Sequence, residues 1–580
     1  MTQDTFQIRH PDRLFIGGEW VRPSTDGVID IVSPVTEQVF AKVAEAREAD
    51  MDAAVAAARK AFDQGPWPRL SHAERADYLR KLADELEKRV PDMAAAWTAQ
   101  IGGLSVMAPM MHMGGVMQYR FYADLAATYP FEVRQPSSIG GTAVLVREPV
   151  GVVAAIAPWN APFMIMTTKV APALLAGCTV IMKPSPETPL ETYILAECAE
   201  AAGFPAGVVN LVPAHREAAD YLVRRPGVDK VAFTGSTAAG RRIASVCGER
   251  IARYTLELGG KSAAIVLDDY DVGQAAKILS STITTLTGQV CATLSRVVVP
   301  KARHDDFVDA LTQELNAVRV GDPTDPETQM GPLAMKRQLE RVQGYIAKGE
   351  AEGARLATGG RRPKHLNLGC YIEPTLFANV ESGMTIAQEE IFGPVISLIP
   401  AEDDEDAIRI ANDSIYGLNG AVFTHDAERA YQVGRRSRPP SPPRPPPAPH
   451  RPCAWAGPNR SSRSGSQLRC PSRSRARAWP KPRTTSIRRR RPAGSSTATS
   501  QAAGVARMAV TRSSRAKRTP PHGRTWPSIS PPWAARVRSN IGGPSRPSPS
   551  AARVSPAGWS WSRDRGGCPR RRLRDRRPTA

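Results

Sequence analysis

Short apolar stretches alternate with helix-length segments from residue 150 onward, and this alternation constrains the fold more than any other feature. Four of the stretches have the length and composition of buried strands: Val152–Ala157, Thr179–Lys183, Val208–Val212 and Lys230–Thr234. Strands that alternate with helices form parallel sheets with helices on both faces. We therefore expect an α/β fold with a doubly wound parallel sheet. Two later stretches, Ser262–Leu267 and Tyr371–Phe377, predict a second α/β unit from about Glu257 onward.

The chain before residue 150 shows a different pattern. Residues 14–46 carry short apolar runs broken by turn residues, which predicts short strands. Ser71 and Glu74 form a capping box, in which each side chain can bind the backbone N–H of the other, and this predicts a helix that runs toward Arg89. Residues 131–150 predict an extended hairpin that turns at Gly140 and the glycine after it.

The composition changes abruptly near Arg436. Residues 437–580 contain 33 Lys and Arg against 2 Asp and Glu, whereas residues 1–436 contain 44 Lys and Arg against 54 Asp and Glu. The net charge of +21 therefore comes from the tail, and the body is slightly acidic. The tail also holds 25 of the 52 prolines, and 31 of its basic residues are arginine. We expect residues 437–580 to be disordered, because such a composition cannot bury a core.

The body shows neither an export signal nor a membrane span in its sequence. Residues 1–13 are polar, and the longest apolar region, residues 150–166, is interrupted by two prolines and an asparagine. The five cysteines of the body have no metal-ligand spacing and no framework of pairs. We expect a soluble, reduced, cytoplasmic protein without a metal site.

Six segments hold residues that could carry chemistry, and each alone also has a plain structural interpretation. They are 158–160, 183–189, 233–240, 257–262, 288–300 and 389–395. Asn160 could tie down a loop or bind an oxyanion, Lys183 could be solvated or meet a phosphate, and Gly235 could form a turn or admit a dinucleotide. Glu257 could cap a turn or act as a general base. Cys291 is by default a buried thiol rather than a nucleophile.

Taken in chain order, these segments closely resemble the aldehyde dehydrogenase superfamily. The order is Asn160, Lys183, Gly235, Glu257, Cys291 and Glu390, and the flanking residues resemble the family from about Leu14 to Gly434. The separation of 34 residues between the glutamate and the cysteine also suits the family. The variants at residues 183–189 and 212–217 resemble a bacterial subgroup that includes terpenoid-aldehyde dehydrogenases.

The resemblance implies the oxidation of an aldehyde substrate to a carboxylic acid with NAD(P). Cys291 would attack the carbonyl as a thiolate, and the Asn160 amide and the backbone N–H of the cysteine would hold the oxyanion. Glu257 would activate the water that hydrolyses the thioester. Relatives that pass the acyl group to coenzyme A lack this base, so the resemblance favours hydrolysis.

The resemblance also implies where the cofactor binds. Trp159 and Lys183 would lie along the adenosine half, and Gly235 and Ser236 near the pyrophosphate and the nicotinamide. Glu390 would hold the nicotinamide ribose. The other implied cofactor-binding residues are Phe392, Ile156, Pro158, Ser185, Leu258 and Gly259. Many NAD-preferring relatives carry an acid three residues after the lysine, whereas this chain has Pro186 there, followed by Glu187. NAD is therefore the expected cofactor and NADP the alternative.

The resemblance further divides the chain into domains. Residues 1–130 and 151–256 would form a dinucleotide-binding domain, 131–150 an oligomerisation hairpin, and 257–436 a truncated catalytic domain. The family continues with a strand, a Pro-Phe-Gly-Gly loop and a C-terminal strand, none of which the tail contains. A family homodimer or homotetramer would therefore lack the strand that pairs with the hairpin. We expect the protein with this tail to be poorly soluble and weakly active.

The tail itself has two interpretations. A bias to Arg, Pro, Ala, Gly and Ser is typical of GC-rich coding DNA read out of frame, which supports a frameshift near codon 436. The alternative is an arginine-rich RNA-binding appendix, which the lack of aromatic interleaving makes the weaker interpretation. A non-catalytic protein on the same fold is a further alternative for the body, against which Cys291, Glu257 and Asn160 argue.

Overall fold

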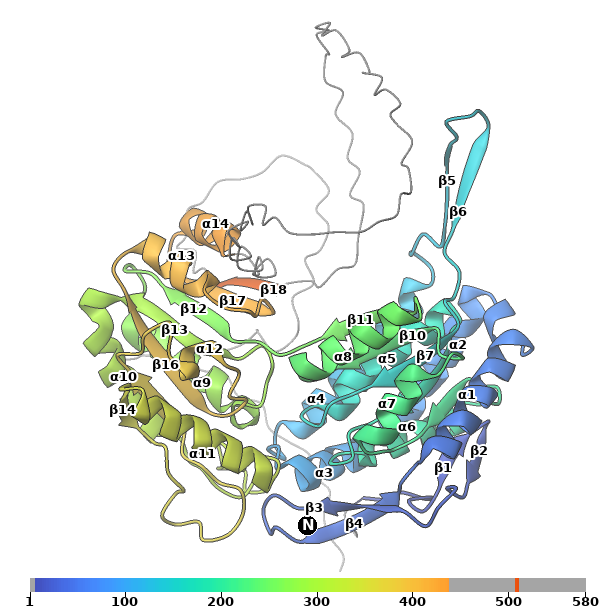
Figure 1. Ribbon diagram of the computed structural model, residues 1–580, viewed down its shortest axis with the longest axis horizontal. Helices are drawn as coiled ribbons and strands as arrows, with labels where there is room; N and C mark the ends of the chain where they lie inside the picture. The colour runs from blue at the N-terminus through green and yellow to red at the C-terminus, as the bar shows by residue number, and fades with distance from the viewer. Residues whose placement is uncertain (1–5, 438–505, 511–580) are drawn as a thin grey trace, which may run out of the picture. The chain divides into compact units, whose positions relative to one another are not determined.

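The computed structural model describes residues 6–437 and 506–510 (Figure 1). Within these residues, one seven-stranded sheet has the order β11-β10-β7-β8-β9-β1-β2. Its strands are β1 Leu14–Ile16, β2 Glu19–Val21, β7 Val152–Ile156, β8 Thr179–Lys183, β9 Val209–Leu211, β10 Lys230–Thr234 and β11 Arg253–Glu257. β7 to β11 run parallel, and β1 is antiparallel to both of its neighbours. The four strands predicted from the sequence are thus confirmed.

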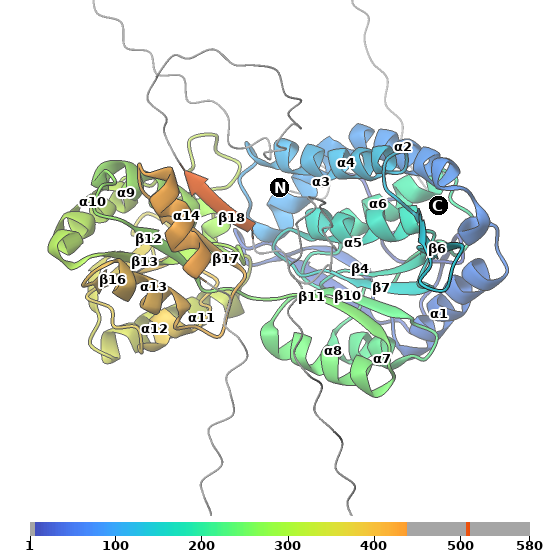
Figure 2. The same ribbon diagram turned by 90° about the horizontal axis from the view of Figure 1, so that it is seen from above.

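Helices cover both faces of this sheet, which confirms the doubly wound α/β prediction (Figure 2). They are α1 Glu48–Asp63, α2 His72–Lys88, α3 Val90–Ile101, α4 Ala108–Leu125, α5 Pro162–Ala176, α6 Leu190–Ala201, α7 Arg216–Arg224 and α8 Thr237–Glu249, with the short 3₁₀ helix η2 Trp67–Arg69. Alternate residues of a strand face opposite sides. Val153 accordingly belongs to an apolar cluster that includes residues of α2 to α6, and Val152 belongs to another that includes residues of α1, α7 and α8.

The helix predicted from the capping box is α2. The backbone N–H of Glu74 donates to Ser71 Oγ at 3.2 Å, and the backbone N–H of Ser71 donates to Glu74 Oε2 at 2.7 Å. These two bonds satisfy donors that the first turn of a helix would otherwise leave open. The helix ends at Lys88, one residue before the predicted limit.

A second seven-stranded sheet has the order β14-β15-β16-β13-β12-β17-β18. Its strands are β12 Ser262–Val266, β13 Leu294–Pro300, β14 Arg355–Thr358, β15 Thr375–Ala378, β16 Val395–Ala401, β17 Asn419–Phe423 and β18 Ala506–Val510. Its helices are α9 Val272–Thr284, α10 His304–Asn316, α11 Lys336–Ala351, α12 Thr385–Gln388, α13 Asp404–Asn412 and α14 Ala427–Arg436, with η3 Thr285–Gly288 and η4 Lys301–Arg303. Two separate apolar clusters pack on its two faces, so a second α/β unit is present.

β15 is shorter than the predicted strand Tyr371–Phe377, because the residues before Thr375 bind elsewhere. The backbone N–H of Glu373 donates to the carbonyl of Arg361 at 2.8 Å, and Pro374 has no N–H to offer. The strand therefore begins only at Thr375 and ends at Ala378.

Two strand pairs lie outside the large sheets. β3 Val28–Val32 pairs with β4 Val39–Ala44, and β5 Glu132–Pro136 pairs with β6 Thr142–Val146. The β5–β6 pair is the predicted hairpin, and Figure 1 shows it standing out from the neighbouring helices. Gly140 and Gly141 turn it with φ of 91° and 80°, a region that glycine enters without strain. The side chains of Val144, Leu145 and Val146 are about half exposed.

Residues 506–510 form β18, which pairs in parallel with β17. This differs from the expectation that the whole of residues 437–580 is disordered. An edge strand such as β17 offers open backbone groups to which a further strand can bind. The remainder of that expectation lies outside the described residues. Among the helices of the described ranges, none is both long and apolar enough to cross a bilayer.

Candidate active site

The predicted cofactor-binding residues gather at one edge of the first sheet. β7, β8 and β10 are parallel neighbours, and Ile156 is paired with Lys183 on one side and with Phe233 on the other. Their carboxyl ends therefore meet at one edge, where open α/β sheets bind ligands. Pro158 and Trp159 follow β7, Ser185 follows β8, and Gly235 and Ser236 follow β10.

The turn after β10 is built for close approach to its backbone. Ser236 is the N-cap of α8, and its Oγ accepts the backbone N–H of Ala239 at 3.3 Å. A Cβ at Gly235 would lie 2.5 Å from the ring of Phe233, and one at Gly240 would lie 2.4 Å from Leu258. A larger residue at either position would have to displace the Phe233 or the Leu258 side chain. The positive end of α8 lies at this turn, and such helix ends favour phosphate groups.

Lys183 is buried at the end of β8, and Glu187 lies close to it. Burial lowers the pKa of Lys183 to about 8, and the negative charge of Glu187 opposes this shift. The Ser185 hydroxyl donates a hydrogen bond to Glu187. A buried cation with one nearby carboxylate fits the ribose and phosphates of a dinucleotide.

Asn160 is buried in the loop between β7 and α5, and its side chain binds the segment that carries Cys291. Its Nδ2 donates to the backbone carbonyl of Gln289 at 2.9 Å. This bond joins the first sheet to the loop that carries the cysteine, two residues before the sulfur. An amide nitrogen carries two N–H donors, so one remains for a substrate oxygen.

The loop before Cys291 has an unusual backbone. Leu286, Thr287 and Gly288 all have positive φ, of 48°, 55° and 70°. For residues other than glycine this conformation is strained and persists only where surrounding contacts fix it. Thr287 Oγ1 donates to the carbonyl of Gly331 at 3.0 Å, and a Cβ at Gly288 would lie 2.2 Å from the carbonyl oxygen of Gly393.

Gln289 fixes the same loop from inside, and the sequence did not point to it. Its Oε1 accepts the backbone N–H of Ala334 at 3.0 Å, and its Nε2 donates to the carbonyl of Leu286 at 2.9 Å. Gln289 is 2% exposed. A polar side chain two residues before the cysteine was the only available signal.

Cys291 is half-buried on the turn between η3 and β13. Burial raises the pKa of its thiol, and the carboxylates of Glu390 and Glu257 raise it further. The backbone N–H groups of Cys291 and Ala292 act in the opposite direction. The sulfur therefore lies within electrostatic reach of both glutamates, and the thiol is protonated at neutral pH unless a base removes the proton.

Glu257 ends β11 and has an exposed side chain. Its backbone carbonyl accepts the N–H of Gly235 at 3.0 Å, which links it to the turn after β10. Lys169, inside α5, is a further charged neighbour that sequence analysis missed. Its Nζ donates to Thr234 Oγ1 at 2.5 Å, and burial lowers its pKa to about 8 against the charge of Glu257. A lysine in an otherwise apolar helix was the signal.

Glu390 folds over the double glycine that follows β11. Its Oε1 accepts the backbone N–H of Gly260 at 3.0 Å, and a Cβ at Gly259 would lie 2.1 Å from Oε2. Burial raises the pKa of Glu390, although the N–H of Gly260 lowers it. Phe392 has φ of 62° and meets Trp159 edge to face, with ring centroids 5.3 Å apart. The predicted site residues therefore lie at the ends of strands or in the segments that connect strands and helices.

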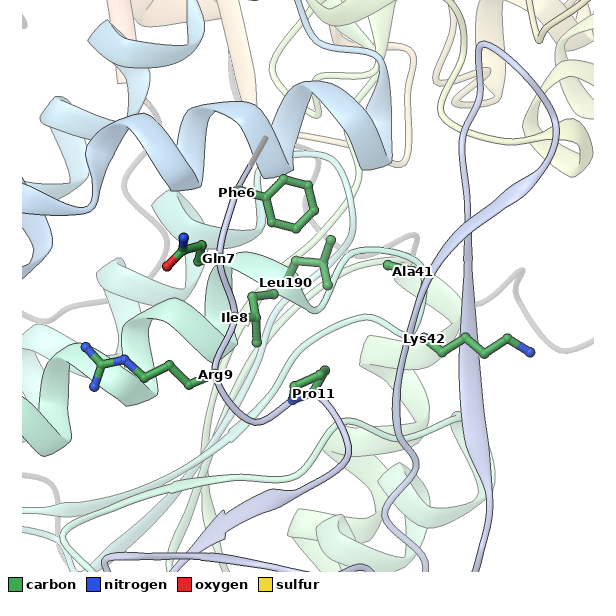
Figure 3. A pocket seen from close by; sticks show the side chains of 8 residues that line it. All are labelled: Phe6, Gln7, Ile8, Arg9, Pro11, Ala41, Lys42 and Leu190. Atoms are coloured by element: carbon green, nitrogen blue, oxygen red, sulfur yellow. The ribbon is translucent and has the colours of Figure 1, made fainter. Parts of the chain in front are cut away.

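Two cavities lie away from these residues. One of about 290 Å³ lies under the N-terminal arm, between Phe6, Ile8 and Leu190, and the charged ends of Arg9 and Lys42 point away from it (Figure 3). The other, of about 470 Å³, lies beside β12 and β17. Neither is lined by a predicted catalytic or cofactor-binding residue.

Comparison of the sequence with known protein families identifies the family of the chain. The family model described as "Aldehyde dehydrogenase family" matches residues 20–439. The chain belongs to this family. Aldehyde dehydrogenases oxidise aldehydes to carboxylic acids with NAD(P), and this chain is accordingly an NAD(P)-dependent aldehyde oxidoreductase. The matches support neither an RNA-binding protein nor a non-catalytic one.

Individual aldehyde dehydrogenases are similar over the same stretch. The geranial dehydrogenase of Castellaniella defragrans is 43% identical over 424 residues, which cover 73% of this chain and 88% of that protein. The crystal structure of a Mycobacterium tuberculosis aldehyde dehydrogenase complexed with NAD+ is 44% identical, with a TM-score of 0.72 over 74% of this chain and 89% of the other. The Pseudomonas syringae aldehyde dehydrogenase C mutant C291A, complexed with NAD+ and octanal, is 37% identical, with a TM-score of 0.72 over 75% and 89%.

Proposed function

We propose that Cys291, Glu257 and Asn160 carry out the aldehyde oxidation. The supporting observation is that one region brings the three together: Asn160 binds the loop of Cys291, and the charge of Glu257 acts on its thiol. Because the raised pKa keeps the thiol protonated, the reaction begins with proton transfer to Glu257.

The thiolate then attacks the aldehyde carbon, forming a C–S bond and an oxyanion. The oxyanion accepts hydrogen bonds from Asn160 Nδ2 and from the backbone N–H of Cys291. A bound NAD(P) would supply the acceptor for the hydride that the adduct loses to become a thioester. Glu257 releases the first proton to solvent and, as a carboxylate again, takes a proton from water. The resulting hydroxide attacks the thioester carbonyl, and the C–S bond breaks to release the acid and the Cys291 thiolate.

The cofactor proposed for this site is NAD, as in the complexes of the two similar structures. Lys183 and Ser185 would bind the adenosine half, and Gly235 and Ser236 the phosphates. Glu390 would bind the nicotinamide ribose. The remaining residues that would contact the cofactor are Ile156, Pro158, Trp159, Leu258, Gly259 and Phe392. The glycine positions that leave no space for a Cβ support this assignment.

An apolar aldehyde is the proposed substrate class. Met111 packs in the same small cluster as Trp159 and Leu286, next to the cysteine loop, and Met110 and Met117 on the same helix are more than half exposed. Flexible methionines adapt to apolar ligands. Two similar proteins are named for geranial or contain octanal.

The proposal extends to the domains, the assembly and the location of the chain. Residues 1–130 and 151–256 would form the cofactor domain, 257–436 the catalytic domain, and 131–150 an oligomer interface, which the exposed apolar residues of β6 support. The five free cysteines of the described ranges are consistent with a reducing cytoplasm.

The test is NADH formation by the purified chain with geranial, octanal and betaine aldehyde. Wild type should turn over the two apolar aldehydes, and C291A should form no NADH. C370A is the matched control, because Cys370 is buried in the core of the second sheet. Equal activity of C291A and wild type would contradict the proposal.

A further inference from the structure

The acidic residue in the loop after Lys183 stands at an unusual position and forms an ion pair. Pro186 occupies the place three residues after the lysine, and Glu187 follows. Both oxygens of Glu187 are engaged. Oε2 accepts the Ser185 hydroxyl, and Oε1 accepts Nη2 of Arg337 at 2.5 Å. Burial alone would raise the pKa of Glu187, but the bond from Ser185 and the charge of Arg337 outweigh burial and lower it.

Arg337 comes from a distant part of the chain, in the first turn of α11. Its side chain is 64% exposed, whereas that of Glu187 is 22% exposed. A guanidinium group has five N–H donors, and one bond to a carboxylate uses only part of them. Arg337 therefore presents further donors to solvent beside the loop of Lys183.

The charges around this loop do not repel a phosphate on the adenosine ribose of the cofactor. Two cations, Lys183 and Arg337, surround one carboxylate, so the group carries a net positive charge. A carboxylate that stands alone repels a phosphate on the ribose, whereas an arginine accommodates one. The ion pair with Arg337 offsets the negative charge of Glu187, so this carboxylate does not repel such a phosphate.

We propose that Arg337 binds the 2′-phosphate of NADP and that the Glu187–Arg337 pair sets the cofactor preference of this chain. Glu187 accepts ribose hydroxyls when NAD is bound, and Arg337 turns from Glu187 to the phosphate when NADP is bound. The chain therefore uses both cofactors. This inference rests on the proposed function, which places the adenosine half at Lys183.

The experiment is calorimetric titration of the full chain with NAD+ and NADP+, and with ADP and adenosine 2′,5′-bisphosphate as fragments. We expect both cofactors to bind. R337Q should raise the Kd for NADP+ about tenfold more than the Kd for NAD+, since one hydrogen bond to a charged group contributes roughly 1.5–3 kcal/mol. The fragments should show the same difference. E187Q should change the ratio of the two Kd values in the opposite direction, because it removes the carboxylate that holds Arg337.

R319Q is the matched control, because Arg319 is an exposed arginine whose partner is Glu327, far along the chain from the cofactor loop. It should leave both Kd values unchanged. Binding of NAD+ without NADP+, or an equal change of both Kd values in R337Q, would overturn the role of Arg337. Failure of both cofactors to bind would overturn the proposed function, and this inference with it.

Discussion

Cys291 depends on its neighbours, because the nearby carboxylates disfavour its resting thiolate, although one of them, Glu257, is the proposed base. Burial and the carboxylates of Glu390 and Glu257 all raise the pKa of the thiol. A thiol with a raised pKa is a poor nucleophile at neutral pH unless a base assists it. Glu257 therefore disfavours the resting thiolate but is expected to promote turnover. The two effects can be measured separately.

E257Q is predicted to separate them. Removing the charge lowers the pKa of Cys291, so the thiolate fraction at pH 7 rises and alkylation by iodoacetamide becomes faster. Turnover should fall by a factor of roughly 10² to 10⁴, because the general base is lost. E389Q, which changes an exposed acid beside Glu390, is the control and should change neither rate. Slower alkylation together with normal turnover would disprove both roles.

N160A is predicted to lower kcat by roughly 10²- to 10³-fold, the usual effect of removing one oxyanion donor. The variant also loses the bond to the Gln289 carbonyl, which costs about 1 kcal/mol of the free energy of unfolding. A thermal melt together with steady-state kinetics distinguishes the two losses. A kcat within threefold of wild type (on the order of 0.6 kcal/mol) would remove Asn160 from the mechanism.

At the scale of elements, the local sequence pattern was enough to predict strands that are buried on both faces. β8 and β10 have the predicted limits at both ends, because each is a short apolar run bounded by turn residues. β15 was predicted too long, because the partner of Glu373 is Arg361 and no local pattern reveals such a bond.

The cysteine loop was predictable only in part. The resemblance pointed to Cys291, but the bond of Thr287 to Gly331 and the bond from Ala334 to Gln289 join the left-handed segment 286–288 and its neighbour to residues more than 40 positions away. Lys169 and Arg337 were missed for the same reason. Their partners, Thr234 and Glu187, lie 65 and 150 positions away in the sequence.

G288A is predicted to inactivate the enzyme and to destabilise it by several kcal/mol. The new Cβ would lie 2.2 Å from the Gly393 carbonyl oxygen at a φ of 70°, so the loop has to move. G344A is the matched control. Gly344 lies inside α11 with no atom within 4 Å of a Cβ, and alanine there should stabilise the helix by roughly 0.5–1 kcal/mol. Chemical denaturation and NADH formation measure both variants. Equal stability of the two variants would contradict the close packing.

At the scale of the whole molecule, the β5–β6 hairpin is the surface through which we propose that copies of the chain associate. Among the residues that the structure describes, its strands pair only with each other, and Val144, Leu145 and Val146 are about half exposed. Open strand edges with apolar side chains promote association of copies. L145D is predicted to lower the sedimentation-velocity mass and to raise the soluble fraction of expressed protein. L368D, at an exposed leucine in a loop, is the control and should change neither. An unchanged mass in L145D would exclude the hairpin as an interface.

The close contact between Gly288 and Gly393 also restricts how the enzyme can diverge. Because not even a methyl group fits between the two loops, neither can accept a larger residue while the other keeps its place. One loop holds the sulfur, and the other follows Glu390. Substitutions in these two loops must therefore occur together. A relative with a different arrangement of the loops would hold both its nucleophile and its cofactor in different positions.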